Sequence, residues 1–154
     1  MLSEAFVQFW VAAVIGVFAV MTLSLYRRKN EHRAEIPAEK IFIPRPFTAE
    51  ELREYDGTRN PLIFVGVKGV VYNVAKEWYG PQSSYNAFAG HESSRQLGKT
   101  KVGREETNAD WTTLSPEHLE TLNQWEERFL SKYIPVGWFV PDGAYYTKGQ
   151  EFTH

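Results

Sequence analysis

The segment LIFVGVKGVVYNV, residues 62–74, decides the architecture of this 154-residue chain. Two apolar runs rich in β-branched residues, Leu62–Val67 and Val70–Val74, flank the pair Lys68-Gly69. Such runs favour strands, and a two-residue connection that contains glycine favours a tight hairpin turn. The sequence therefore predicts a sheet built around this hairpin.

Helix signals lie on both sides of the hairpin. The capping-box pattern at Thr48 and Glu51 predicts a short helix before it. Ser115 and Pro116 are typical of a helix start, and Pro135 ends the longer helix that they open. The apolar residues of that helix are Leu119, Leu122, Trp125, Phe129 and Tyr133. Because they recur at helical spacing, one face of the helix belongs to the core.

The remaining segments carry weaker signals. Glycine, proline, serine and aromatic residues mix between residues 78 and 98, which predicts loops and short helices able to form a pocket wall. Residues 98–113 are polar, which predicts an excursion of the chain that is exposed to solvent. Residues 136–140 predict a return strand, and residues 141–154 predict a polar tail.

The composition excludes several classes of function. A formal net charge of −2 argues against a nucleic-acid surface, which normally carries a basic patch. The chain has no cysteine, so it has no disulfide framework, no thiolate nucleophile and no thiolate-ligated haem. The spacing of its residues matches no catalytic grouping, phosphate-binding glycine loop or zinc motif. We therefore expect a protein that is not an enzyme.

Residues 5–25, AFVQFWVAAVIGVFAVMTLSL, form an uncharged apolar run. Its length is sufficient for a helix to cross a hydrocarbon core of about 30 Å. A signal peptide is the alternative, but its apolar region would span about 7–15 residues after a basic start, and here Glu4 precedes the run. We therefore predict an N-terminal transmembrane anchor within residues 1–29.

The basic residues Arg27, Arg28, Lys29 and Arg33 follow the predicted anchor. By the positive-inside rule, the N-terminus lies outside and the C-terminal part faces the cytosol or the mitochondrial matrix. Residues 30–46 are polar and proline-containing, which indicates a linker. A soluble domain at residues 47–140 and the tail at residues 141–154 complete the predicted organisation.

Four segments carry a resemblance to a known family. They are FTAEELREYDG from residue 47, the hairpin from residue 62, YGPQSSYNAFAGHESSR from residue 79 and LNQWEERFLSKYIPVG from residue 122. In this order they resemble the membrane-associated progesterone receptor family, whose members also carry an N-terminal anchor. The resemblance implies an α+β fold of the cytochrome b5 type, with a small mixed sheet and short helices around a haem cleft.

The resemblance also implies how haem b is held. Cytochromes of the parent fold clamp the iron between two histidines, one in an HPGG motif that this chain lacks, and His91 alone lies near the expected cleft. In the family that the chain resembles, the iron ligand is a tyrosine, and the matching position is Tyr85. Tyr79, Lys132 and Tyr133 match positions that line the family's haem site. Lys132 is expected to pair with a propionate, and Tyr133 to donate a hydrogen bond to the ligating phenolate.

The sequence departs from the family's pattern at two points. Gln82-Ser83-Ser84 precedes Tyr85 where a Gly-Pro pair is common, and His91 replaces a usual arginine. These differences concern the shape of the pocket. The ligating oxygen itself is unaffected by them.

The resemblance implies a membrane-anchored haem-binding protein of the endoplasmic reticulum or the mitochondrial inner membrane. It would store or deliver haem, or support haem monooxygenases and sterol metabolism, and a homodimer formed through haem is a family possibility. One alternative is a structural accessory subunit of a large membrane complex, such as a respiratory complex, with its haem site unused. Another is a steroid or lipid site in the same cleft. If the chain has no such ligand site, the tyrosines are core aromatic residues whose hydroxyl groups reach solvent or the backbone.

Overall fold

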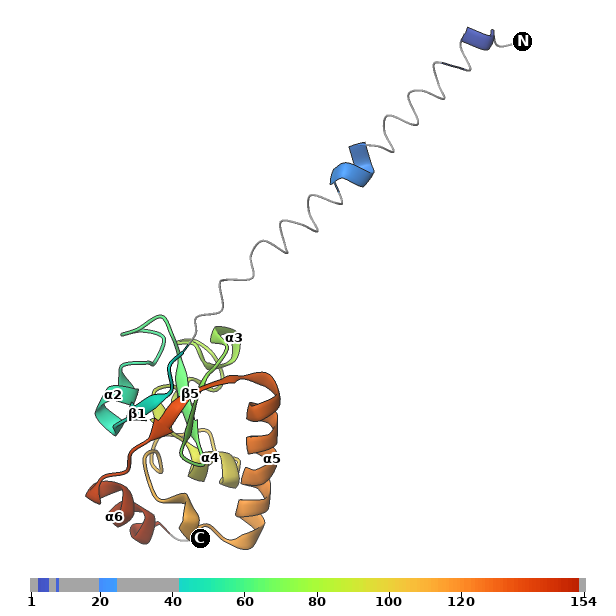
Figure 1. Ribbon diagram of the computed structural model, residues 1–154. Coiled ribbons are helices and arrows are strands. Elements are labelled where there is room, and N and C mark those ends of the chain that lie inside the picture. Colours follow the sequence, from blue (N-terminus) through green and yellow to red (C-terminus); the bar gives the residue numbers. More distant parts are fainter. Residues whose placement is uncertain (1–2, 6–7, 9–19, 25–41, 153–154) are drawn as a thin grey trace. The chain divides into compact units, whose positions relative to one another are not determined.

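The computed structural model describes residues 3–5, 8, 20–24 and 42–152 (Figure 1). The chain divides into two compact units, Met1–Ile41 and Phe42–His154. Most of the predicted membrane span at residues 5–25 lies outside the described residues. Within the described part, no helix is long and apolar enough to cross a membrane.

A mixed five-stranded sheet organises the second unit (Figure 1). Its strands are β1 (Arg45–Phe47), β2 (Phe64–Val67), β3 (Val70–Asn73), β4 (His91–Glu92) and β5 (Ile134–Phe139), in the order β1-β5-β3-β2-β4. The pairs β2–β3 and β3–β5 are antiparallel, while β1–β5 and β2–β4 are parallel. The predicted hairpin and return strand are both confirmed.

The hairpin turn follows from its two residues. Lys68 and Gly69 have φ angles of 49° and 79°, the left-handed values that match the twist of the flanking strands. Glycine adopts this conformation without steric cost, and the Lys68 side chain reaches Glu126 Oε2 at 2.7 Å. The turn is therefore fastened to the helix that packs beside it.

Helices, most of them short, surround the sheet. They are α2 (Ala49–Arg53), α3 (Lys76–Tyr79), η1 (Asn86–Phe88), α4 (Ser94–Lys99), η2 (Trp111–Thr113), α5 (Pro116–Lys132) and α6 (Gly143–Glu151). The predicted capping box is confirmed, because Thr48 Oγ1 accepts from Glu51 N and Glu51 Oε2 accepts from Thr48 N. The predicted start of α5 is confirmed as well, with Ser115 Oγ accepting from His118 N at 3.3 Å.

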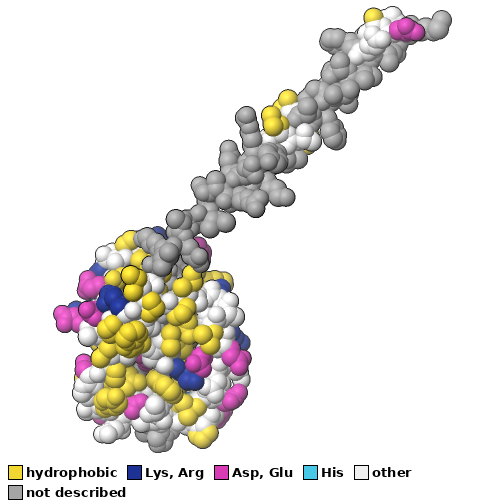
Figure 2. Space-filling view, viewed as in Figure 1, with side chains coloured by type: hydrophobic (Ala, Val, Ile, Leu, Met, Phe, Trp, Pro, Cys, Tyr) yellow, Lys and Arg dark blue, Asp and Glu magenta, His cyan; other side chains and the backbone are white. Residues whose placement is uncertain are grey.

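Apolar residues form two clusters because successive residues of β2 point to opposite faces of the sheet. Val65 and Val67 join one cluster, together with Phe129 of α5. Phe64 joins the other, together with Phe139. Figure 2 shows further hydrophobic side chains on the outer face over β1 and β5. The second unit thus has a complete core of its own.

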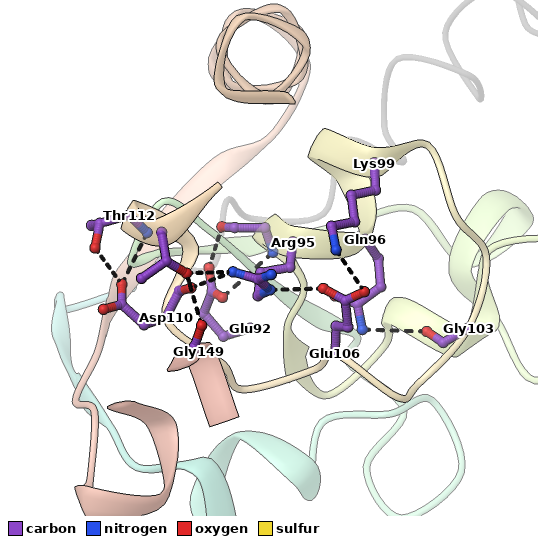
Figure 3. A network of polar contacts seen from close by, with 11 residues as sticks. Glu92, Arg95, Gln96, Lys99, Gly103, Glu106, Asp110, Thr112 and Gly149 are labelled. Carbon is purple, nitrogen blue, oxygen red and sulfur yellow. Dashed lines mark hydrogen bonds and ion pairs between the residues drawn. The ribbon is translucent and has the colours of Figure 1, made fainter. Parts of the chain in front are cut away.

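The predicted exposed excursion at residues 98–113 is wrong in its second half. Glu106 is only 8% exposed, and its carboxylate accepts from Arg95 Nε at 2.7 Å and from Lys99 Nζ at 3.0 Å (Figure 3). A polar sequence indicates exposure only where its charges are unpaired, and here a buried cation 11 positions earlier pairs with the acid.

The compact unit also extends beyond the predicted domain limits of residues 47 and 140. Strand β1 begins at Arg45, and residues 143–151 of the predicted polar tail form α6. Asp142 Oδ1 caps this helix by accepting from Tyr145 N at 2.9 Å, and the buried Tyr145 ring packs against Phe139. Asp110 N also donates to Tyr145 O at 3.1 Å, and Thr113 Oγ1 donates to Gly149 O at 3.0 Å, so packing and hydrogen bonds together hold the tail on the domain.

Candidate functional site

A pocket of about 300 Å³ brings together the four residues predicted for the site. Tyr79, Tyr85, Lys132 and Tyr133 all line it. The other lining residues are Trp78, Trp125, Arg128, Phe129 and Ser131. This volume lies at the lower end of the range, about 300–1,000 Å³, that is usual for small-molecule sites.

The wall that carries Tyr79 and Tyr85 is held by short-range hydrogen bonds. Tyr79 ends α3, and its carbonyl oxygen accepts from Asn86 Nδ2 at 3.0 Å. Tyr85 N donates to Trp78 O at 3.2 Å, which folds the connecting loop back onto the helix. A Cβ on Gly80 would lie 2.4 Å from Lys76 O, so only glycine permits this close return. The loop predicted from the sequence thus forms one side of the pocket.

The opposite wall is the last turn of α5. Phe129 is buried beneath the pocket, with an exposed fraction of 1%. Tyr133 is the C-cap residue, and its backbone N–H donates to Phe129 O at 2.9 Å. Its extended backbone conformation, with φ −124° and ψ 155°, begins β5 instead of continuing the helix. The helix end therefore places Lys132 and Tyr133 side by side at the pocket.

The tyrosine rings form one contiguous group. The ring centroid of Tyr79 lies 5.9 Å from that of Tyr85 and 6.1 Å from that of Tyr133. The hydroxyl groups of Tyr79 and Tyr133 lie close enough to interact electrostatically. Burial raises the pKa of Tyr79, and the nearby Tyr133 and Tyr85 hydroxyl groups raise it further. Tyr79 is therefore a neutral hydrogen-bonding group at physiological pH.

Two cations stand at the mouth of the pocket, and both are exposed. Lys132 Nζ lies 5.4 Å from the ring centroid of Trp78 and 5.5 Å from that of Tyr133. Arg128 Cζ lies 5.0 Å from the ring centroid of Trp125. The mouth is therefore positively charged, whereas the interior is aromatic.

His91 is placed elsewhere. It lies on β4, pairs with Val65 in the sheet and does not line the pocket. Burial lowers the pKa of His91 to about 4, assisted by the positive charges of Arg104 and Arg53. The expectation that His91 lies near the cleft followed from its position six residues after Tyr85, but His91 is not among the residues that line the pocket.

The residues present fit a haem group. Apolar aromatic walls suit a flat macrocycle, cations at the mouth suit its carboxylates, and phenol oxygens can ligate ferric iron. In the part of the chain that the structure describes, three or more His, Cys, Asp or Glu side chains nowhere gather as a metal site. A tyrosine-lined pocket is therefore the candidate site that these residues offer.

Sequence reasoning missed four pocket residues that bear on the chemistry: Trp78, Trp125, Arg128 and Phe129. The helical spacing of Trp125 and Phe129 indicated burial but not a pocket. Arg128 lies four residues before Lys132 and therefore on the same helix face, which is a signal that would have found it.

Comparisons with known proteins identify relatives of this chain. No protein-family model matches the chain. The cytochrome P450 regulator dap1 of Schizosaccharomyces pombe is 38% identical over 138 residues, which cover 82% of each chain. Human membrane-associated progesterone receptor component 2 is 36% identical over 104 residues, which cover 64% of this chain and 47% of that protein.

A solved structure gives the same result for the fold. A protein from Arabidopsis thaliana, described as having a cytochrome b5 like fold, superposes with a TM-score of 0.59 at 39% identity. The match covers 63% of this chain and 92% of the Arabidopsis chain, so the domain alone makes up nearly all of that folded protein. With its α+β sheet, its order of elements and these relatives, the chain belongs to the membrane-associated progesterone receptor family and has a cytochrome b5-like domain.

Proposed function

We propose that this chain is a membrane-anchored haem-binding protein in which Tyr85 supplies the oxygen ligand of ferric haem b. The observation that carries the proposal is the gathering of Tyr79, Tyr85, Lys132 and Tyr133 around one aromatic pocket. These residues are separated by up to 54 positions in the sequence and come from two walls. A core built only for stability has no need of three tyrosine hydroxyl groups at one opening.

Each residue has a proposed role that suits its surroundings. Tyr85 is half-buried, which leaves its hydroxyl group accessible to a ligand. The rings of Tyr79 and Tyr133 pack edge to face, so the two residues form the polar side of the pocket together. Lys132, exposed at the mouth, would receive a propionate. Phe129 closes the floor against water.

An anionic phenolate ligand favours Fe(III) over Fe(II), so bound haem would have a low reduction potential. Such a haem is a poor electron carrier, and the proposed role is therefore to hold haem or to support haem monooxygenases. The name of the yeast relative, a cytochrome P450 regulator, is consistent with a monooxygenase partner. Neither role requires the chain to act as an enzyme.

The test is the absorption spectrum of residues 42–154 titrated with ferric haem. We expect a high-spin ferric spectrum at one haem per chain for the wild type, and its loss in Tyr85→Phe. Tyr146→Phe is the matched control, because Tyr146 is 52% exposed on α6 and does not line the pocket. Absence of haem uptake by the wild-type domain would overturn the proposal.

We also propose that residues 5–25 anchor the protein, with the domain on the cytosolic or matrix side. The support is the uncharged apolar run, the basic residues after it and the membrane association stated in the name of the human relative. Alkaline carbonate extraction of cell membranes tests this. The full chain should stay in the membrane pellet, and a variant without residues 1–29 should be released.

A steroid site is the second candidate, because the pocket walls are largely apolar and the human relative is named as a progesterone receptor component. Saturable steroid binding by the haem-free domain would favour it. The accessory-subunit alternative makes a different prediction, namely co-purification with a large membrane complex and no haem in the purified chain. The haem titration separates the haem function from these two alternatives, and steroid binding or co-purification then separates the alternatives from each other.

A further inference from the structure

Five cations of the described domain lie over aromatic rings: Arg45, Lys68, Arg95, Arg128 and Lys132. Three of them also pair with a carboxylate. Arg45 is 3.7 Å from Glu51, Lys68 is 2.7 Å from Glu126, and Arg95 is 2.7 Å from Glu106. Among the described residues, Arg128 and Lys132 pair with none. Of these five cations, the two without a described carboxylate partner are therefore the two at the pocket mouth.

Their arrangement is set by α5. Arg128 and Lys132 are four residues apart, which places them on one helix face with their Cβ atoms about 6 Å apart. Each is held by a tryptophan that also lines the pocket, Trp125 in one case and Trp78 in the other. Because each cation rests on a ring, it is restrained at the rim instead of extending into solvent.

The chain as a whole does not attract anions, since its formal net charge is −2. A preference for an acidic ligand must therefore come from local charges. Two restrained cations beside an apolar cavity suit a ligand whose body is flat and apolar and whose edge carries two carboxylates. A neutral steroid would bury its body equally well but would leave both cations without an anion.

We propose that Arg128 and Lys132 form a cation pair that selects a flat dicarboxylate ligand over a neutral one. The proposal rests on the proposed haem function, since haem is such a dicarboxylate. It adds that Arg128 contributes to this selection as much as Lys132 does. It also assigns a separate task to each side of the pocket, because Tyr85 is needed for iron and the cation pair for carboxylates.

The experiment uses a porphyrin without iron, so that carboxylate binding is measured apart from ligation. Residues 42–154 are titrated with protoporphyrin IX and with its dimethyl ester, and binding is followed by porphyrin fluorescence anisotropy. We expect Arg128→Gln and Lys132→Gln each to weaken protoporphyrin binding about fivefold, as for one exposed ion pair. The double variant should lose about 20-fold, and none of the variants should change binding of the ester.

Lys101→Gln is the matched control, because Lys101 is an exposed lysine that does not line the pocket. The cation pair is refuted if the wild type binds the ester as tightly as the acid, or if Arg128→Gln matches wild type. If neither porphyrin binds, the haem function and the cation pair both fail. If the carboxylate effect is present but ferric haem gives no Tyr85-dependent spectrum, only tyrosinate ligation fails.

Discussion

The pocket and the buried polar network around Arg95 combine cations with aromatic rings in opposite ways. Arg95 has no exposed surface, and it donates to Glu106 Oε2, to Asp110 O and to Thr113 Oγ1 (Figure 3). Arg128 is exposed and forms no ion pair with a described carboxylate. Similar residue types therefore differ in their partners: Arg95 finds its partners within the chain, whereas Arg128 has no described carboxylate paired with it.

Position in the fold explains the difference. Arg95 belongs to α4, and the segment carrying Glu106 and Asp110 wraps over it. A buried charge must be paired, so this segment and the helix stabilise each other. Arg128 lies on the last turns of α5, next to a cavity instead of a covering segment. This comparison leads to three predictions about stability, which follow in order of expected size.

Replacing Arg95 should have the largest effect. Arg95→Met removes the cation and leaves Glu106, which is 8% exposed, with only Lys99 as its ionic partner. Breaking a buried pair in this way costs about 3–5 kcal/mol of unfolding free energy. Urea unfolding of residues 42–154 measures the loss. Arg45→Met is the control, because the Arg45 pair with Glu51 is exposed and should contribute less than about 1 kcal/mol.

A wild-type unfolding midpoint for Arg95→Met would contradict this account of the network. The cation of the network would then contribute no more to stability than the exposed cations of the pocket. Ferric haem titration of the same variant adds a second readout, since any folded fraction should keep its haem site.

The second prediction concerns Glu92, which is 1% exposed and accepts a hydrogen bond from Ser94 Oγ. Burial raises the pKa of Glu92 to about 7 from 4.5, although hydrogen bonds from Ser94 and Gly69 oppose the shift. The folded state therefore binds the proton more tightly than the unfolded state does. Stability from this group is complete below pH 4.5 and is lost as the pH rises through about 7, by about 3 kcal/mol in total.

Glu92→Gln removes this titration and keeps the size of the side chain. Urea unfolding at pH 5 and pH 8 should show the variant gaining on the wild type as the pH rises. His91 acts in the other direction, because its pKa is lowered and its contribution is lost as the pH falls. It is present in both proteins, so it cancels in the comparison. A constant difference between the two proteins would show that Glu92 does not titrate in this range.

Local signals made much of the fold predictable. The hairpin at residues 62–74, the capping box at Thr48 and the start of α5 at Ser115 each depend on residues a few positions apart. The Arg95–Glu106 pair depends on burial, which the polar segment itself does not indicate. Helix α6 was missed for a similar reason, since contacts with distant residues hold it to the domain: Tyr145 packs on Phe139, and Thr113 Oγ1 donates to Gly149 O.

The site was predictable in part. The resemblance named Tyr79, Tyr85, Lys132 and Tyr133, and the structure places all four at one pocket. It did not indicate Arg128, because a lysine or arginine near a helix end usually faces solvent and interacts with the helix dipole. Its contact with Trp125 becomes meaningful only when the cavity beside both residues is known.

The third prediction concerns Arg128, whose replacement should have the smallest effect on the free energy of unfolding. Arg128→Met removes a cation that forms no ion pair within the described chain, so unfolding free energy should change by less than about 0.5 kcal/mol. Urea unfolding of residues 42–154 without ligand measures this value. A loss above about 1 kcal/mol would mean that the fold itself needs the Arg128–Trp125 contact. A stable variant that binds protoporphyrin IX poorly would instead separate the two roles of cations in this protein, because Arg95 would then matter for folding and Arg128 for the ligand.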